Sequence, residues 1–143
     1  MRIRGSCLCG SVAYECGPAL GPMGHCHCPK CRKAHGAAFS TTVRVARAGF
    51  RWLSGEDLLE SFESSPGKRR SFCSRCGSHL VAGWDGQDAL ILRVGCVDGD
   101  PGVRPVVHIW TSLAAEWYEI DAQLPCLAEG APGRTGERDE TQE

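Results

Sequence analysis

Short segments in which apolar and polar residues alternate make up most of the chain. Between residues 39 and 45, Phe39, Thr41, Val43 and Val45 alternate with polar or small residues, and this period of two is typical of a half-buried β-strand. Further short strands are predicted at residues 2–6, 11–15, 50–53, 58–62, 78–82, 89–94 and 106–110. Turn residues separate these segments, and helical periodicity is almost absent. The pattern therefore predicts a mainly β fold.

The first two strands are expected to form a β-hairpin around a Cys-Leu-Cys-Gly turn at residues 7–10. Gly10 supplies the positive φ that such a turn commonly needs. A loop rich in glycine and proline is predicted at residues 17–22. One short helix is predicted at residues 29–35, because proline suits the first helical turn, where its missing N–H would have no partner.

A chain of 143 residues, 42% hydrophobic and 23% charged, has the size and composition of one soluble globular domain. Its formal net charge of −1 gives no bulk electrostatic reason to expect nucleic acid or a membrane surface as a partner. The sequence has neither an apolar run long enough for a transmembrane helix nor the apolar core of a secretory signal. We therefore expect a cytoplasmic protein.

The composition changes near the C-terminus. Residues 127–143 contain five acidic and two basic residues, and no large apolar residue follows Leu127. Such a segment cannot bury enough apolar surface to offset the entropy of ordering. The sequence thus predicts one zinc-binding β domain over residues 1–126 and a disordered acidic tail over residues 127–143.

Ten cysteines are the most unusual feature of the composition. Seven of them fall into tight groups, namely Cys7 and Cys9, then Cys26, Cys28 and Cys31, then Cys73 and Cys76. In a reducing compartment such groups usually bind metal, and a disulfide between Cys7 and Cys9 would be strained. We therefore expect metal-bound thiolates rather than disulfides. The three solitary cysteines, expected to be inert thiols, are Cys16, Cys96 and Cys126.

Two of the groups fit one structural zinc ion, which takes four tetrahedral ligands, usually as two close pairs from separate loops. The pairs are Cys7 with Cys9 and Cys73 with Cys76. Such a site would clamp the N-terminal hairpin to the middle of the chain and supply folding energy directly. Four thiolates leave the complex negatively charged, and the nearby cations that could offset this charge are Lys68, Arg69, Arg70 and Arg75.

Cys26, Cys28 and Cys31 form a group of three, and three protein ligands with an open fourth position are typical of a catalytic zinc ion. The alternative is that a fourth protein ligand closes the site. The candidates for that ligand are His25, His27, His35, His79, His108 and the solitary cysteines. Because His27 lies between two of the cysteines, we expect it to point away and to support the site from behind. A pairing of Cys7 and Cys9 with the group of three also remains open.

Four motifs follow one another along the chain. They are Gly-Ser-Cys-Leu-Cys-Gly-Ser-Val at 5–12, Cys-His-Cys-Pro-Lys-Cys-Arg-Lys at 26–33, Arg-Ser-Phe-Cys-Ser-Arg-Cys-Gly-Ser-His-Leu at 70–80, and Arg-Pro-Val-Val-His-Ile-Trp at 104–110. In this order they resemble the glutathione-dependent formaldehyde-activating enzyme family, which also includes centromere protein V. The resemblance covers roughly residues 2–126.

The resemblance implies coiled antiparallel β-sheets, a fold shared with a zinc-bearing chaperone of Rab GTPases and with methionine sulfoxide reductases of the B type. It also implies two zinc ions per chain. Matching positions make the structural set Cys7, Cys9, Cys73 and Cys76, and the active-site set Cys26, Cys28 and Cys31. The implied activity joins a thiol and an aldehyde, glutathione and formaldehyde, as S-(hydroxymethyl)glutathione, and is classed as a carbon–sulfur lyase for the reverse direction.

The predicted open zinc site suits this chemistry, because zinc stabilises a thiolate, which is the nucleophilic form of a thiol. A substrate thiol in the open position would lose its proton and attack an aldehyde carbonyl held close by. Glutathione also carries two carboxylates. The candidate cations to bind them are Lys30, Arg32, Lys33, Arg69 and Arg70.

Three other functions compete with this one. A non-catalytic zinc module would bind a protein partner, as the related chaperone suggests. Nucleic-acid binding would depend on the basic residues at 30–33 and 68–70, and the near-neutral charge argues against it. A sulfoxide reductase would need a redox-active cysteine such as Cys96 or Cys126, and nothing around either suggests a depressed pKa.

Overall fold

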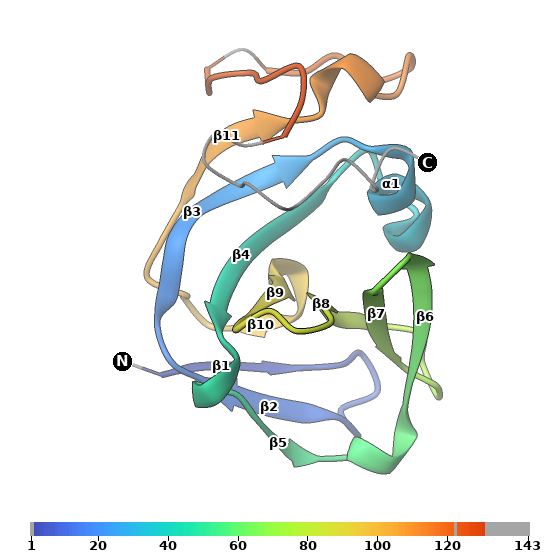
Figure 1. Cartoon of the computed structure of the whole chain (residues 1–143), viewed down its shortest axis with the longest axis vertical. Coiled ribbons are helices and arrows are strands. Elements are labelled where there is room, and N and C mark those ends of the chain that lie inside the picture. The colour runs from blue at the N-terminus through green and yellow to red at the C-terminus, as the bar shows by residue number, and fades with distance from the viewer. Residues whose placement is uncertain (1, 122, 131–143) are drawn as a thin grey trace.

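The structure is a computed structural model that describes residues 2–121 and 123–130. Two β-sheets dominate it (Figure 1), one with the strand order β11-β3-β4-β9-β8-β7-β6 and one with the order β10-β1-β2-β5. The strands are β1 (Ile3–Ser6), β2 (Ala13–Cys16), β3 (Ala19–Cys26), β4 (Ser40–Ala46), β5 (Arg51–Ser54), β6 (Leu59–Ser65), β7 (Lys68–Cys73), β8 (His79–Trp84), β9 (Ala89–Arg93), β10 (Val97–Asp98) and β11 (Pro105–Ile109). The helices are α1 (Pro29–His35) and the short 3-10 turns Arg47–Gly49, Glu56–Leu58, Val94–Cys96 and Thr111–Leu113.

The mainly β fold is confirmed, and each strand predicted from the alternating pattern is present near its expected place. The N-terminal hairpin forms as an antiparallel pair of β1 and β2. The helix is confirmed at Pro29–His35, where the Cys28 side chain caps its first turn and Gly36 ends it in the left-handed conformation with a φ of 58°. Glycine adopts this conformation without the steric cost that other residues meet.

The loop predicted at residues 17–22 is wrong, because β3 begins at Ala19. The pairing of β3 with β4 is irregular between Leu20 and Gly24, and Gly21 and Pro22 lie within this bulge. A bulge tolerates both residue types within a strand, which explains why composition alone suggested a loop. The sheets are also not purely antiparallel, since β11 pairs with β3 in the parallel sense.

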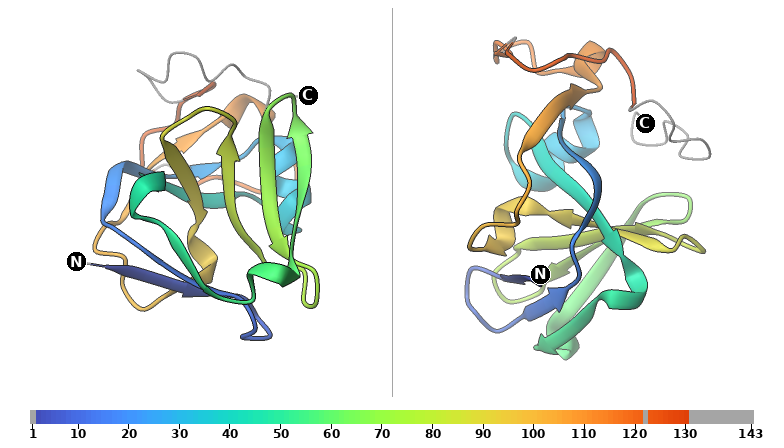
Figure 2. Two further views of the ribbon diagram at one scale, coloured as in Figure 1. Left: turned by 60° about the horizontal axis from the view of Figure 1, so that its bottom comes forward. Right: turned by 90° about the vertical axis from the view of Figure 1, so that its left-hand side faces the viewer.

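One face of the larger sheet packs on the smaller sheet and forms the main core. Val43 and Leu92 from the larger sheet belong to the same buried cluster as Ile3 and Tyr14 from the smaller one, and each is at most 2% exposed. Figure 2 shows the blue N-terminal strands below the green and yellow strands of the larger sheet. Side chains alternate between the faces of a strand, so the neighbouring residues on β4 and β9 face the other way, toward α1. That second face carries the candidate site.

The chain after β11 turns back along it. The Leu127 N–H donates to the His108 carbonyl oxygen over 2.8 Å, and the Thr111 N–H donates to the Leu127 carbonyl oxygen over 3.1 Å. Residues 127–129 are therefore paired with the segment around β11. Residues 131–143 lie outside the described residues, so the disordered acidic tail and the domain limit at residue 126 stay predictions.

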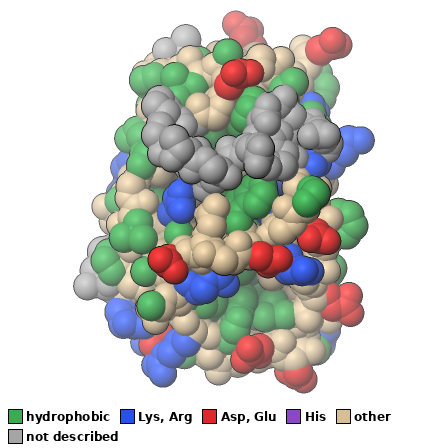
Figure 3. Space-filling model, in the orientation of Figure 1, with side chains coloured by type: hydrophobic (Ala, Val, Ile, Leu, Met, Phe, Trp, Pro, Cys, Tyr) green, Lys and Arg blue, Asp and Glu red, His purple; other side chains and the backbone are tan. Residues whose placement is uncertain are grey.

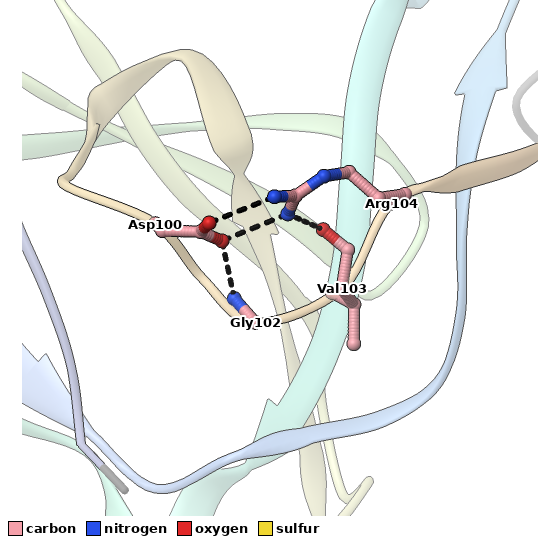
Figure 4. A network of polar contacts seen from close by, with 4 residues as sticks. All are labelled: Asp100, Gly102, Val103 and Arg104. Carbon is pink, nitrogen blue, oxygen red and sulfur yellow. Dashed lines mark hydrogen bonds and ion pairs between the residues drawn. The ribbon is translucent and has the colours of Figure 1, made fainter.

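The loop that leads into β11 is held by Arg104, the first residue of the fourth motif. Its guanidinium donates to both carboxylate oxygens of Asp100 over 2.8 Å, and the same carboxylate accepts the Gly102 N–H over 2.8 Å (Figure 4). This arginine thus has a local structural partner.

Acidic and basic side chains are interspersed on the face drawn in Figure 3. In the part of the chain that the structure describes, every helix is too short or too polar to cross a membrane.

Candidate metal centres

The four cysteines predicted for a structural zinc ion lie together. Cys7 and Cys9 come from the turn between β1 and β2, whereas Cys73 ends β7 and Cys76 follows in the next turn. All four Sγ atoms lie within 4.8 Å of one another, with 3.6 Å between Cys7 and Cys9 and 3.9 Å between Cys9 and Cys73. Tetrahedral ligands at the zinc–sulfur bond length are about 3.8 Å apart. The sulfur set therefore fits one zinc ion.

Local hydrogen bonds shape this four-cysteine cluster before any metal binds. The Val12 N–H donates to the Cys7 Sγ over 3.3 Å, and the Gly77 N–H donates to the Cys73 carbonyl oxygen over 2.8 Å. Hydrogen bonds from the side chain and backbone of Ser78 lower the pKa of Cys76 to about 5. At neutral pH this thiol is a thiolate, which is the form that binds metal.

The second group also forms as predicted. Cys26 ends β3, Cys28 caps α1, and Cys31 lies in the first turns of α1, so that one strand end and one helix start bring the three together. Their Sγ atoms lie within 4.8 Å of one another, and the side chains are at most 5% exposed. We call these residues the three-cysteine cluster.

In the described part of the chain, no further histidine, cysteine or carboxylate joins the three-cysteine cluster. His27 instead contacts His108, with 2.8 Å between Nε2 and Nδ1, and His25 contacts Thr41, with 2.8 Å between Nδ1 and Oγ1. His35 and His79 face each other, with ring centroids 5.3 Å apart. The cysteines of the N-terminal hairpin belong to the other cluster, so the mixed pairing is wrong.

All ten cysteines lie among the described residues, and none of them forms a disulfide. Of the solitary ones, Cys16 is buried in the main core and Cys126 is exposed. Cys96 donates from Sγ to the His79 carbonyl oxygen over 3.2 Å, and burial raises its pKa. None of the three belongs to either cluster.

Three buried cations lie on the same face of the larger sheet as the three-cysteine cluster. Lys68, Arg70 and Arg93 are 4%, 2% and 3% exposed. Arg70 donates from Nη1 and Nη2 to the Cys31 Sγ over 3.8 and 3.9 Å, so it supports this cluster rather than the four-cysteine cluster. Hydrogen bonds from Cys26 and Cys28 hold the pKa of Cys31 well below its usual value, and the charges of Arg93 and Arg70 act in the same direction.

Sequence reasoning missed Arg93. It ends an otherwise apolar strand, Ala89–Arg93, in which every residue is buried. A charged residue in such an apolar strand could have indicated a functional site, because an arginine is almost never fully buried without a partner.

Of the five cations proposed for substrate carboxylates, Lys33 is exposed and the other four have partners within the protein. Lys30 donates from Nζ to the Ser65 Oγ over 2.7 Å, and Arg32 donates to the carbonyl oxygens of His27 and Leu113. Arg69 lies within 4.0 Å of the carboxylate oxygens of Glu63 and Asp85.

Arg75 is expected to offset the charge of the four-cysteine cluster. It donates to the Ser11 Oγ over 3.1 Å, beside that cluster.

A pocket of about 370 Å³ lies beside the three-cysteine cluster. Its lining residues come from α1 and the segment after it, from β4, and from the segments around β8 and β9: Ala34, His35, Phe39, Ser40, Thr41, Gly77, Ser78, His79, Arg93, Gly95 and Cys96. The volume lies within the usual range for small-molecule sites. None of the three cysteines lines the pocket, but Ser40, which does, pairs with Cys26 across β3 and β4, whereas Gly77 and Ser78 of the lining follow Cys76 of the other cluster.

His35 should make the stability of the protein depend on pH. Burial, and next the positive charge of Arg93, lower the pKa of His35 from 6.5 to about 4. Between these values the unfolded chain binds a proton that the folded protein does not, so stability is lost as the pH falls through this window. His35→Gln should narrow the difference in unfolding free energy between pH 7 and 4.5 by about 2 kcal/mol.

Urea unfolding of zinc-loaded wild type and variant at both pH values checks this prediction. Loss of zinc in acid is common to both proteins and cancels in the comparison. Lys33→Gln, at an exposed position of the same helix, is the matched control and should leave the difference unchanged. An equal pH dependence in wild type and His35→Gln would contradict the prediction.

Comparison with known proteins agrees with this architecture. A crystal structure of a Rhodobacter sphaeroides protein superposes with a TM-score of 0.58 at 21% sequence identity, covering 71% of this chain and 91% of that one. This likeness shows a shared fold. No curated protein matches the chain significantly. The family model described as "Glutathione-dependent formaldehyde-activating enzyme" matches residues 2–113, which include every residue of both cysteine clusters, and the chain therefore belongs to the glutathione-dependent formaldehyde-activating enzyme family.

Proposed function

We propose that this protein is a zinc-dependent carbon–sulfur lyase that forms and splits a thiol–aldehyde adduct, with S-(hydroxymethyl)glutathione as the substrate. The observation that carries the proposal is the three-cysteine cluster. It offers three buried sulfur ligands with no fourth from the residues that the structure describes, and a pocket of small-molecule size adjoins it at Ser40. The family match supports glutathione and formaldehyde as the two reacting compounds.

Cys26, Cys28 and Cys31 would hold the second zinc ion, and the other cluster would hold the first. Three thiolate ligands would leave one position on the ion for a substrate thiol, and the chemistry that zinc would supply there is stabilisation of that thiol as the thiolate. The Arg70 guanidinium donates hydrogen bonds to the Cys31 Sγ and so fixes the orientation of that ligand. The burial of all three cysteines keeps bulk water away from the reacting atoms.

Formation of the adduct requires one new carbon–sulfur bond and the transfer of one proton. The substrate sulfur forms a bond to the aldehyde carbon, and the carbonyl oxygen takes up the proton that the thiol releases. In the reverse direction the carbon–sulfur bond breaks and the proton returns. The imidazoles of His35 and His79 line the pocket and are neutral at pH 7, since burial lowers the pKa of each. Their unprotonated nitrogens can accept a hydrogen bond from the adduct hydroxyl, whereas a pKa of about 4 makes His35 too weak a base to hold the proton at pH 7.

The first experiment counts zinc ions by native mass spectrometry and measures adduct exchange between glutathione and ¹³C-formaldehyde by NMR. We expect two ions per chain, one of them exchangeable, and a rate above the uncatalysed addition that thiols undergo without protein. One tightly held ion and no acceleration would overturn the proposal. Zinc would then be structural only, and a protein-binding module would become the better hypothesis.

A further inference from the structure

Unpartnered polar atoms concentrate around the pocket beside the three-cysteine cluster. Of the seven buried side-chain nitrogen and oxygen atoms without a hydrogen-bond partner in the described residues, five belong to residues that line it. They are His35 Nε2, Ser40 Oγ, His79 Nδ1, and Nε and Nη2 of Arg93. Buried polar groups in folded proteins nearly always have a partner. Such a concentration therefore marks a place for a polar ligand.

Strand register brings this site next to the cysteines. Cys26 on β3 pairs with Ser40 on β4, and Thr42 on β4 pairs with Arg93 on β9. Because Ser40 and Thr42 are two residues apart, all four residues lie on one face of the sheet. Arg93 and Cys26 therefore border the same space between this face and α1, two strands apart.

The charges on this face do not balance without a ligand. Three thiolates around a divalent zinc ion leave one negative charge, whereas Lys68, Arg70 and Arg93 bring three positive charges. Among the described residues, the one buried acidic side chain is Glu15, which lies in the smaller sheet and pairs with arginines there. A substrate thiolate supplies one more negative charge. A second anionic group on the same substrate would offset part of the positive charge that remains.

Arg93 is the cation placed to bind that second group. Arg70 is engaged by Cys31, and Lys68 lies over the Trp84 ring, 5.3 Å from its centroid. In Arg93 the two unpartnered nitrogens, Nε and Nη2, are on the same edge of the guanidinium. Two parallel N–H groups on one edge match the two oxygens of a carboxylate.

We propose that Arg93, assisted by Ser40, binds a carboxylate of the substrate and so selects thiols that carry a carboxylate group. This inference rests on the proposed function, because it takes the substrate sulfur to lie at the three-cysteine cluster. Arg93 lines the pocket and is 3% exposed, so a carboxylate bound to it would be largely withdrawn from solvent. Water cannot compete well for the arginine there, which strengthens the charged hydrogen bonds.

Isothermal titration calorimetry on the zinc-loaded protein tests the inference with two probes. The probes are 3-mercaptopropionate and 2-mercaptoethanol, both short thiols, of which only the first has a carboxylate. We expect the first to bind at least about tenfold more tightly. Arg93→Lys keeps the charge but loses the paired N–H groups, and should reduce the preference to about threefold or less.

Two further variants control this comparison. Arg104→Lys weakens an arginine–carboxylate pair that does not line the pocket and should keep the full preference. Ser40→Ala is a milder change within the site and should reduce the preference about threefold. If Arg93→Lys loses zinc or folded structure, Ser40→Ala and the wild-type preference decide the question.

The outcomes separate the inference from the proposed function. A wild-type protein without a preference, or a preference that survives both Arg93→Lys and Ser40→Ala, overturns the inference, even if thiols bind and the adduct reaction is accelerated. A third probe, 3-(methylthio)propionate, has the carboxylate but no free thiol. If it binds through Arg93 while adduct exchange is not accelerated, the carboxylate site stands and the proposed function fails.

Discussion

Cys73→Ser is expected to lower the free energy of unfolding by at least about 4 kcal/mol, the largest stability effect of any single substitution considered for this protein. Cys73 is fully buried at the end of β7, and its Sγ lies 3.9 Å from that of Cys9 in the N-terminal turn. A metal ion at this cluster would join segments more than 60 residues apart in the sequence. Its binding energy would therefore also be folding energy, and losing one ligand would forfeit much of it.

Few direct contacts would remain between the hairpin turn and the segment after β7. One is the hydrogen bond from the Leu8 N–H to the Ser78 Oγ, 2.9 Å long and exposed to solvent. Exposed hydrogen bonds of this kind contribute about 1 kcal/mol or less. They cannot replace the metal, so we expect the turn at residues 7–10 to detach first, while β1 and β2 stay packed in the main core.

Urea unfolding followed by circular dichroism measures the effect, with zinc content determined on the same samples. Cys126→Ser is the matched control, because Cys126 is an exposed solitary thiol outside both clusters. It should change the stability by less than about 0.5 kcal/mol. A Cys73→Ser protein that keeps both its stability and a full complement of zinc would show that the four-cysteine cluster is not a structural metal site.

The two cysteine pairs and the group of three could be predicted from the sequence because the members of each are close neighbours along the chain, whereas the meeting of Cys9 with Cys73, 64 residues away, shows only in the structure. Residues two or three positions apart in a tight turn necessarily bring their side chains near one another, whatever the rest of the fold does. The same locality explains why the helix was predicted correctly: Pro29 and the residues around it set its start. Local signals are enough for features of this kind.

The position of Arg93 beside the three-cysteine cluster and the parallel pairing of β11 with β3 could not be predicted in this way. Both depend on how segments far apart in the sequence pack together. The sequence places Arg93 more than 60 residues from Cys31, and only the register of β3, β4 and β9 shows that both border one space. Alternation along β7 has a similar effect, because it buries Arg70 and leaves Arg69 half-exposed among carboxylates. The basic run at residues 68–70 thus supplies two charges, Lys68 and Arg70, to the face of the site and one, Arg69, to the surface, which composition cannot distinguish.

Cys28→Ser is expected to abolish adduct exchange, with a loss of at least about 100-fold, while leaving the fold intact. Activity should be lost while the fold is kept, because Cys28 has two roles and serine can take over only one of them. Its Sγ is one of the three clustered sulfur atoms, and it also accepts the Cys31 N–H over 3.4 Å as the cap of α1. Serine is among the best capping residues, so the helix keeps its cap while the cluster loses a sulfur ligand.

Zinc stoichiometry and exchange rate should therefore fall together in Cys28→Ser, from two ions toward one, with an unchanged circular dichroism spectrum. Cys96→Ser is the matched control, since Cys96 lines the same pocket without joining the cluster. It should retain both ions and most of the activity. If Cys28→Ser kept full activity, the three-cysteine cluster could not be the reaction centre. If both variants lost activity equally with both ions bound, the pocket rather than the metal would carry the chemistry.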